Sequence, residues 1–319
     1  MNLRDIWKAR AVIKKELPPT PLMHSSELSA LTGVPVYLKL EQLQPSGSFK
    51  LRGATHMIAS LTDAQKEKGV VTFSTGNHGF AVARAAAAHG IRAVICVAET
   101  VTRAKIEALQ QSGAELRVEG KSQDEAGKIS AELVQKEGLT LIPPFDHPFI
   151  IAGQGTIGLE LLEDLPDIST VIAGLSGGGL LSGLGLAMKE ADSSIQVHGV
   201  TISKSAAMQE SLKAGYPVEV DETPTLADSL LGGIGLDNQY TMAMIKRYTD
   251  IRCAVSEEAI ARAMAFLYKK HRLIVEGGAA VGVSALLEKS IRPDGPTVIV
   301  ITGNSIDPAV HYETVTPYL

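Results

Sequence analysis

The chain has 319 residues, of which 45% are hydrophobic and 20% charged, and its formal net charge is −5. This composition is typical of a globular protein with one large domain or two. The acidic balance, without a basic run, argues against a nucleic-acid partner. No apolar stretch is long enough to span a membrane. A small-molecule partner and a cytoplasmic location are therefore expected.

Strand-like and helix-like patterns alternate along the chain, after an amphipathic helix predicted over residues 1–17. The predicted strands are 36–41, 70–74, 92–98, 115–119, 170–175, 195–201, 251–256 and 297–302. The predicted helices are 51–59, 77–89, 102–112, 122–136, 150–163, 180–190, 203–214, 256–271 and 278–288. This alternation predicts an α/β fold with mostly parallel sheets covered by helices. Two lobes are expected, with the ligand in the cleft between them, at the carboxyl ends of the strands.

The two cysteines, Cys96 and Cys253, lie far apart in strand-like runs. They are predicted to be buried free thiols, because they form no metal-ligand spacing. The histidines are also scattered, so no metal site is predicted.

The first stretch with chemical content is 45–54, Pro-Ser-Gly-Ser-Phe-Lys-Leu-Arg-Gly-Ala, between a strand and a helix. Ser48 is a suitable N-cap residue, which places Lys50 in the first turn of the helix. The positive end of the helix dipole disfavours an ammonium there, and Phe49 and Leu51 flank the side chain. Lys50 is either a solvated surface lysine or an amine with a lowered pKa, which a Schiff-base lysine needs.

The second stretch, Ser74-Thr75-Gly76-Asn77-His78-Gly79, lies between a strand and an alanine-rich helix. Its hydroxyls, amide, imidazole and backbone N–H groups could converge on a carboxylate. An ordinary turn in which Asn77 caps the helix is the alternative.

The third stretch, Ser176-Gly177-Gly178-Gly179-Leu180, also follows a strand and precedes a helix. Successive glycines allow the backbone to wrap an anion at the positive end of a helix, which predicts a phosphate cradle. A turn without a ligand is the alternative.

Two other functions fit the third stretch less well. Gly177, Gly179 and Gly183 approximate a dinucleotide-binding pattern, but the next strand does not end in an acidic residue. Gly174-Leu175-Ser176-Gly177-Gly178 matches a hydrolase nucleophile elbow, with Asp228 and His271 in the required order. That hypothesis leaves the other two stretches without a role.

Together the three stretches, with Ala152-Gly153-Gln154-Gly155-Thr156 and Glu276-Gly277-Gly278, resemble the fold type II pyridoxal-phosphate enzymes of the threonine dehydratase and serine racemase family. The likeness spans nearly the whole chain. Residues 233–238 and 272–278 look most like the dehydratase of hydroxyectoine utilisation.

The resemblance implies a role for each site residue. Lys50 forms the Schiff base with pyridoxal 5′-phosphate and is the base at the substrate α-carbon, and Thr75 stands where the racemase has a serine proton donor. The implied cofactor-binding residues are Phe49, Lys50, Asn77, Ser176, Gly177, Gly178, Gly179, Leu180, Glu276 and Thr302. The implied substrate-binding residues are Ser74, Thr75, Asn77 and His78. Ile301 is the alternative to Thr302 at the pyridine nitrogen, and a surface position is the alternative for Glu276.

The implied reaction is β-elimination on a small β-hydroxy amino acid, such as L-threonine, L-serine or 3-hydroxyaspartate, which releases a keto acid and ammonia. Alternatives are a hydroxyectoine-pathway dehydratase, a serine racemase and a non-catalytic metabolite-binding protein.

The implied domains are a large one, 1–59 with 148–319, and a small mobile one, 60–147. A homodimer is expected. The racemase's divalent-cation site is not, since Thr201, Ser203 and Ser205 stand where carboxylates are needed.

Overall fold

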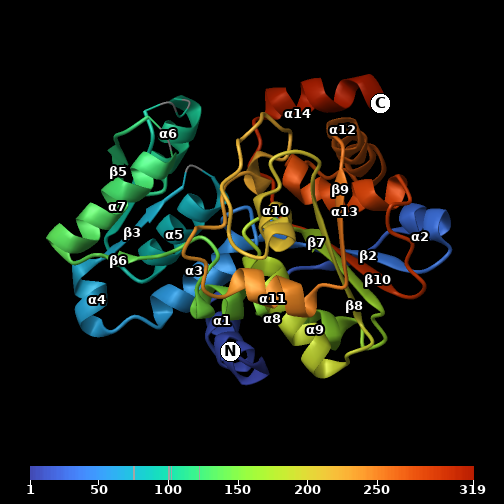
Figure 1. The fold of residues 1–319 in the computed structure, drawn as a ribbon, viewed down its shortest axis with the longest axis horizontal. Coiled ribbons are helices and arrows are strands. Elements are labelled where there is room, and N and C mark those ends of the chain that lie inside the picture. Colours follow the sequence, from blue (N-terminus) through green and yellow to red (C-terminus); the bar gives the residue numbers. More distant parts are fainter. Residues whose placement is uncertain (75, 100, 102, 122) are drawn as a thin grey trace.

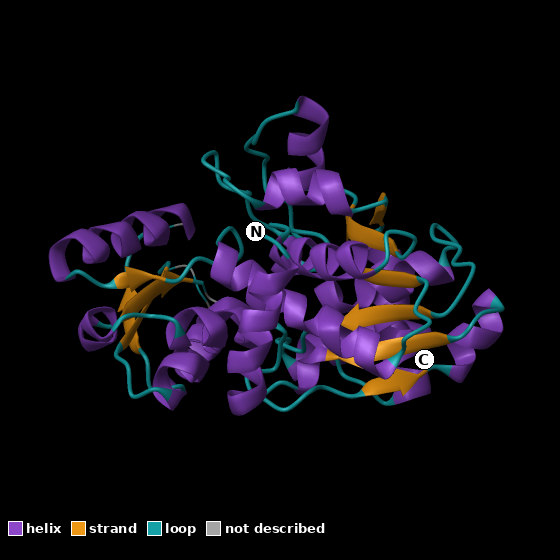
Figure 2. Ribbon diagram, turned by 90° about the horizontal axis from the view of Figure 1, so that it is seen from below, coloured by secondary structure: helices purple, strands orange, loops and turns teal. Residues whose placement is uncertain are grey.

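The computed structural model describes residues 1–74, 76–99, 101, 103–121 and 123–319, without the side chains of residues 103–105 and 123–124. Two separate sheets run through it, and Figure 1 shows the smaller one on the left and the larger one on the right. Viewed from below, in Figure 2, helices fill the space between the two sheets. The predicted α/β class with parallel sheets is confirmed.

The larger sheet has six strands in the order β1-β2-β10-β7-β8-β9. Its strands are β1 (Leu22–His24), β2 (Val36–Leu40), β7 (Thr170–Gly174), β8 (Gln196–Ile202), β9 (Ile251–Val255) and β10 (Thr297–Ile301). All neighbours pair in parallel except β1 and β2. In β10, Val298 and Val300 face one hydrophobic core while Ile299 and Ile301 face another. Helices therefore cover both faces, as the continuous apolar strand sequences predict.

The smaller sheet has four parallel strands in the order β5-β4-β3-β6. They are β3 (Val70–Phe73), β4 (Ala93–Val97), β5 (Glu115–Val118) and β6 (Thr140–Leu141). In β4, Val94 and Cys96 pack with α7 (Gln123–Glu137), while Ile95 and Val97 pack with α5 (Asn77–Ala88) and α6 (Arg103–Gln111) on the other face. The two strand faces thus contribute to different cores.

The remaining helices surround the larger sheet or connect the two sheets. They are α1 (Leu3–Glu16), α2 (Ser26–Thr32), α3 (Lys50–Ala59), α4 (Asp63–Lys68), α8 (Pro148–Asp164), α9 (Gly179–Ala191), α10 (Ala207–Ala214), α11 (Thr241–Tyr248), α12 (Glu257–Phe266), α13 (Gly277–Leu287) and α14 (Pro308–Val315). One π-helical turn, η3 (Leu267–His271), continues α12, and 3-10 turns lie at η1 (Glu41–Leu43), η2 (Asp228–Leu230) and η4 (Thr316–Tyr318).

Every predicted strand and helix has a counterpart, and the differences are local. The sequence patterns missed the short strands β1 and β6 and the helices α2, α4, α11 and α14, which are two to eight residues long. The helix predicted from residue 203 begins only at Ala207, because β8 continues through Ile202 and a bend follows it. Short elements carry too few periods of the hydrophobic pattern to be recognised.

Helix α3, which begins at Lys50, packs closely against α8. A Cβ atom added to Gly153 would lie 2.6 Å from the Cα atom of Gly53 and 2.8 Å from the carbonyl oxygen of Arg52. No side chain fits there, so glycine is required on both helices where they cross. This close contact fixes α3, which begins at Lys50, against α8.

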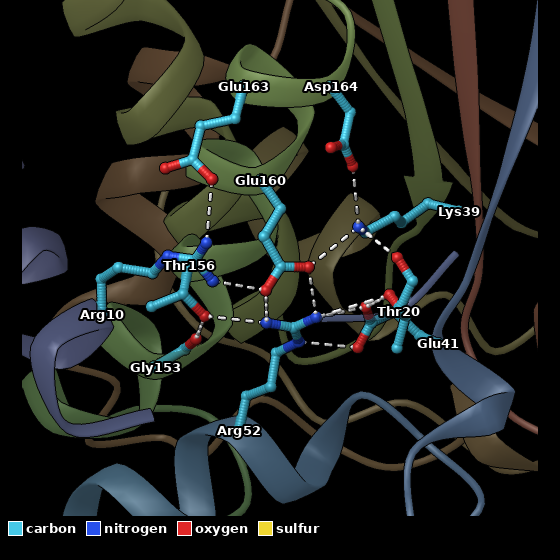
Figure 3. A network of polar contacts seen from close by, with 10 residues as sticks. All are labelled: Arg10, Thr20, Lys39, Glu41, Arg52, Gly153, Thr156, Glu160, Glu163 and Asp164. Carbon is cyan, nitrogen blue, oxygen red and sulfur yellow. Dashed lines mark hydrogen bonds and ion pairs between the residues drawn. The ribbon is translucent and has the colours of Figure 1, made fainter. Parts of the chain in front are cut away.

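A buried network of charges also holds this helix in place (Figure 3). The guanidinium group of Arg52, fully buried, forms 2.7 Å hydrogen bonds with Glu41 and with Glu160. Lys39 on β2 reaches Glu160 at 2.8 Å, and Arg10 on α1 reaches it at 2.7 Å. Burial alone would raise the pKa of Glu160, but the hydrogen bonds and charges of Arg52 and Lys39 lower it to about 2. The network thus joins α3 to four other elements, α1, β2, η1 and α8.

Candidate active site

A cavity of about 900 Å³ collects the predicted site residues. Those that line it are Phe49, Lys50, Ser74, Asn77, His78, Ser176, Gly177, Gly178, Gly179, Leu180, Glu276 and Thr302. They come from the ends of β3, β7 and β10 and from the starts of α3, α5, α9 and α13. The remaining predicted residue, Thr75, lies outside the described residues. Strand-to-helix turns of two sheets therefore meet in one space, as parallel topology favours.

Lys50 projects into this cavity from the first turn of α3. Its Nζ donates a 2.7 Å hydrogen bond to the carbonyl oxygen of Pro144 and lies 5.4 Å from the centre of the Phe49 ring. Burial lowers the pKa of this amine to about 8, although the negative charge of Glu276 opposes the shift. Lys50 is therefore not the solvated surface lysine that was the alternative.

The helix that carries Lys50 is not capped as the sequence predicts. Its N-cap residue is Phe49, which makes no side-chain cap hydrogen bond, and the Ser48 hydroxyl is buried without a partner. Ser48 instead pairs by its backbone with Gly303, directly after β10. The prediction of Ser48 as N-cap is wrong, because the helix begins after Phe49 and the Ser48 hydroxyl accepts no N–H group of its first turn.

Asn77 and Glu276 form a buried pair at one side of the cavity. The amide Nδ2 of Asn77 donates to both carboxylate oxygens of Glu276 at 2.9 Å, and the backbone N–H of Ser305 donates to one of them at 3.1 Å. Burial raises the pKa of Glu276. The surface alternative for Glu276 is wrong, since only 3% of the residue is exposed. The Oδ1 atom of Asn77 is buried without a partner.

His78 lies next to this pair and is buried. Its Nε2 forms a 2.9 Å hydrogen bond with the carbonyl oxygen of Ile142, which makes Nε2 the protonated nitrogen. Burial, together with the charge of Lys50, lowers the pKa of His78 to about 3. The ring is therefore neutral and its N–H is in use. The role of His78 in holding a substrate carboxylate stays a prediction. A neutral ring offers no positive charge to such a carboxylate.

The three glycines after β7 form a cradle of backbone at the start of α9. A Cβ atom on Gly177 would lie 2.4 Å from Cδ1 of Phe145, and Gly178 has φ +87°. Any other residue type would clash at the first position and be strained at the second. The backbone N–H groups at the start of α9 have no partner within the helix, which suits an anion.

The alternatives for this stretch are not assembled. Ser176 lines the cavity, but His271 does not and instead hydrogen-bonds to Ser25 at 3.0 Å. The predicted hydrolase triad is therefore wrong. A Cβ on Gly183 would lie 2.4 Å from the carbonyl oxygen of Ile151, so this glycine allows α9 to pack closely against α8.

At the end of β10, Thr302 lines the cavity while Ile301 is fully buried in the hydrophobic core. Of the two candidates for the pyridine-nitrogen position, only Thr302 is thus accessible to a ligand in the cavity. The backbone carbonyl of Thr302 accepts a 3.1 Å hydrogen bond from the N–H of Phe49, which ties the end of β10 to the lysine turn.

Sequence patterns missed the crossing segment, residues 142–146, which runs from β6 to α8. Its carbonyl groups at Ile142 and Pro144 bind His78 and Lys50, and its Phe145 ring packs against the glycine cradle. The Pro143-Pro144 pair indicated only a crossing between domains. Irregular backbone carries no periodic pattern, so its contacts could not be predicted.

Among the described residues, no group of three or more histidine, cysteine, aspartate or glutamate side chains lies close enough to hold a metal ion. Nor does any helix of the described chain have the length and apolarity to cross a membrane. Both cysteines are free thiols, but Cys253 is only half-buried, because β9 lies at the edge of its sheet.

Comparisons with known proteins agree with this geometry. A family model described as pyridoxal-phosphate dependent enzyme matches residues 13–303. A provisionally named threonine dehydratase of Sinorhizobium fredii is 44% identical over 316 residues, which are 99% of this chain and 95% of the relative. An L-threonine ammonia-lyase of Thermotoga maritima is 40% identical over 96% of this chain and 76% of its own.

Among solved structures, maize serine racemase superposes with a TM-score of 0.92 at 32% identity, over 99% of this chain and 97% of the racemase. The predicted family, fold class and cofactor are confirmed. The finer resemblance to the hydroxyectoine dehydratase is not tested by these relatives and stays a prediction. A match over nearly the whole chain, with the motif residues gathered in one cavity, shows that this protein belongs to the family of pyridoxal-phosphate dependent enzymes.

Proposed function

We propose that the protein catalyses β-elimination on a small β-hydroxy amino acid, such as L-threonine or L-serine, and releases a keto acid and ammonia. One observation carries the proposal: a half-buried amine with a lowered pKa, Lys50, lies in one cavity with an anion cradle and with the turn that begins α5. The names of the two relatives given above, a dehydratase and an ammonia-lyase, support this reaction.

The residues present fit the cofactor. The cradle at 177–179 is open because its glycines have no Cβ atom to fill it. The Oδ1 atom of Asn77 is buried without a partner, which supports a ligand at this place. In our proposal Lys50, Asn77 and Thr302 hold the ring end and the cradle holds the phosphate. When bound, pyridoxal phosphate withdraws electrons from the substrate's α-carbon and acidifies its C–H bond.

Lys50 is the proposed base that takes the α-proton. With a pKa of about 8, roughly a quarter of its amine is neutral at pH 7.5, against about 0.1% at the ordinary lysine pKa of 10.5. The carbonyl oxygen of Pro144 orients the amine before reaction. Ser74, at the end of β3, offers a hydroxyl at the turn where the substrate carboxylate is proposed to bind.

The charges around the cavity bear on the substrate side chain. Lys50 is the single lysine or arginine among the described residues that line it, and the lining carboxylates are Asp146, Glu219, Asp221, Glu222, Asp228, Asp237 and Glu276. A second carboxylate on the substrate would find no lysine or arginine besides Lys50 among the described lining residues, so we expect threonine and serine to be better substrates than 3-hydroxyaspartate.

The test replaces Lys50 by alanine and measures keto acid and ammonia formed from L-threonine, L-serine and 3-hydroxyaspartate. We expect a loss of at least about 10³-fold in kcat with the first two substrates, because the variant lacks the base. Lys136→Ala, at an exposed lysine, is the control and keeps full activity. Full activity of Lys50→Ala would refute the proposal, and a coloured wild-type protein without turnover would indicate a metabolite-binding protein.

Serine racemisation is a second candidate, because the maize serine racemase shares the fold at a TM-score of 0.92. Thr75 is the proposed second catalytic residue, in place of the racemase serine. Chiral analysis of serine during the reaction distinguishes the two: inversion without net loss of serine indicates a racemase, and net loss with ammonia indicates a lyase. Turnover of hydroxyectoine, measured in the same way, tests the pathway assignment.

We also propose the domain division 1–59 with 148–319 and 60–147, because all four strands of the smaller sheet lie within 60–147 and those of the larger sheet lie outside it. The small domain would close over the substrate. Limited proteolysis with and without L-serine tests this closure. A homodimer and a cytoplasmic location remain predictions, and light scattering of the purified protein tests the first.

A further inference from the structure

We propose that Asp146 is a positioning residue that joins the two walls of the glycine cradle and thereby sets its affinity for the cofactor phosphate. The inference rests on the cofactor of the proposed function and not on the identity of the amino acid substrate. It concerns the crossing segment 142–146, to which the sequence motifs assign no role.

One wall of the cradle is Phe145. Its ring carbons would lie 2.4–2.6 Å from a Cβ on Gly177, and its own Cβ would lie 2.9 Å from a Cβ on Gly179. The Phe145 ring and backbone therefore touch the first and third glycines. Any shift of the crossing segment changes the space on this side of the cradle.

The other wall is formed by α10 and α11. A Cβ on Gly178 would lie 2.9 Å from the Cε atom of Met208, 3.0 Å from Cγ1 of Ile245 and 3.1 Å from Cβ of Thr241. Thr241 is the first residue of α11 and is fully buried. The middle glycine thus rests on the beginning of a short helix whose position must be fixed.

The first turn of α11 has one local partner, Asn238, whose side chain accepts the N–H of Met242 at 3.0 Å, and Asp146 caps the preceding N–H groups from almost a hundred residues away. The N-cap residue, Tyr240, makes no side-chain cap hydrogen bond. The carboxylate of Asp146 instead accepts the backbone N–H groups of Gln239 at 2.6 Å, Tyr240 at 3.0 Å and Thr241 at 2.8 Å. A carboxylate at a helix N-terminus satisfies donors that lack partners and interacts favourably with the dipole.

Because Asp146 directly follows Phe145, these three hydrogen bonds connect the two walls through a single residue. Without the carboxylate, three N–H groups lose their partner and Thr241 is no longer tied to the crossing segment. The cradle N–H groups would then be less preorganised for a phosphate. The charge of Asp146 by itself would repel a phosphate, so a purely Coulombic role predicts the opposite sign: tighter binding when the charge is removed.

The experiment measures the dissociation constants of pyridoxal phosphate and of pyridoxal, which lacks the phosphate, for the cofactor-free protein. It compares the wild type with Asp146→Ala, Asp146→Asn and Asp307→Ala. Asp307 is the matched control: it caps α14 through a 2.7 Å bond from the N–H of Ala309, and it does not line the cavity. Thermal unfolding without cofactor reports whether each variant is folded.

We expect Asp146→Ala to weaken pyridoxal phosphate binding at least about tenfold, equivalent to about 1.4 kcal/mol, and to change pyridoxal binding less than about twofold. Asp146→Asn keeps an acceptor oxygen and the residue's size, so it should fold even if the alanine variant does not, with a smaller loss. Asp307→Ala should bind both compounds as the wild type does.

Three results would overturn the inference. One is unchanged or tighter binding of pyridoxal phosphate by the folded Asp146 variants. The others are an equal loss of affinity for pyridoxal phosphate and pyridoxal, or the same loss of affinity in Asp307→Ala. The first would assign the residue a Coulombic role or none, and the others a general structural role. A wild-type protein that binds no pyridoxal phosphate would instead refute the proposed function, and the inference with it.

Discussion

The buried network beneath α3 allows a stability prediction with a defined pH dependence. Glu160 has an ordinary glutamate pKa of 4.5 in the unfolded chain and a pKa of about 2 in the folded protein. Each unit of difference corresponds to 1.36 kcal/mol, so its ionised form stabilises the fold by about 3 kcal/mol at pH 7. Because the folded pKa is the lower one, this contribution is present above pH 4.5 and is lost as the pH falls towards 2.

Glu160→Gln keeps the shape of the side chain and removes the charge that Arg52, Lys39 and Arg10 share. We expect the variant to be less stable by about 3 kcal/mol at pH 7, and the difference to fall to about 1.4 kcal/mol at pH 3. Urea unfolding at both pH values measures it, provided that the slope with denaturant concentration is unchanged.

The control is Glu163→Gln, because Glu163 belongs to the same network and shares Arg10 with Glu160. Glu163 pairs with Arg10 at 2.9 Å, but 54% of its side chain is exposed, so solvent screens the pair and the loss should stay below about 1 kcal/mol. Equal losses for the two variants, or a Glu160→Gln difference that does not shrink in acid, would show that the network does not stabilise the ionised carboxylate.

Two further predictions concern the lysine and the helix that carries it. The rate at which cofactor-free protein reacts with pyridoxal phosphate should rise nearly tenfold from pH 6 to 7 and level off above about pH 8, because burial lowers the pKa of Lys50 to about 8. Stopped-flow absorbance measures this rate. A rate that still rises at pH 10 would contradict the lowered pKa of Lys50. Gly153→Ala should cost about 1–3 kcal/mol, because its Cβ would lie 2.6 Å from Gly53. Gly127→Ala is the control on another helix and should cost much less, because its Cβ would lie at ordinary contact distances of 3.5–3.7 Å from the Phe73 ring. Urea unfolding compares the two variants, and equal costs would argue against a backbone clash.

The amino-acid sequence by itself determined the fold class and identified motif residues that line one cavity. Each of the three motifs is a strand, a turn and a helix start, and the chemistry of such a turn depends on local residue types: glycine where a Cβ cannot fit, and a lysine in the first helical turn. In a parallel sheet these turns come together at the carboxyl ends of the strands, so the local patterns of Lys50, Asn77 and the cradle also predict their convergence.

Only the tertiary structure decided the contacts between segments far apart in the chain. Ser48 looks like a helix cap, but its backbone pairs with Gly303 after β10 and its hydroxyl caps no helix. Asp146 looks like an ordinary polar loop residue, and its three donors lie 93–95 residues further on. Arg52 belongs to a recognised motif, yet its partner Glu160 lies 108 residues away. Local propensity and periodicity describe each element separately, whereas the partner of a buried polar group depends on where the whole chain places it.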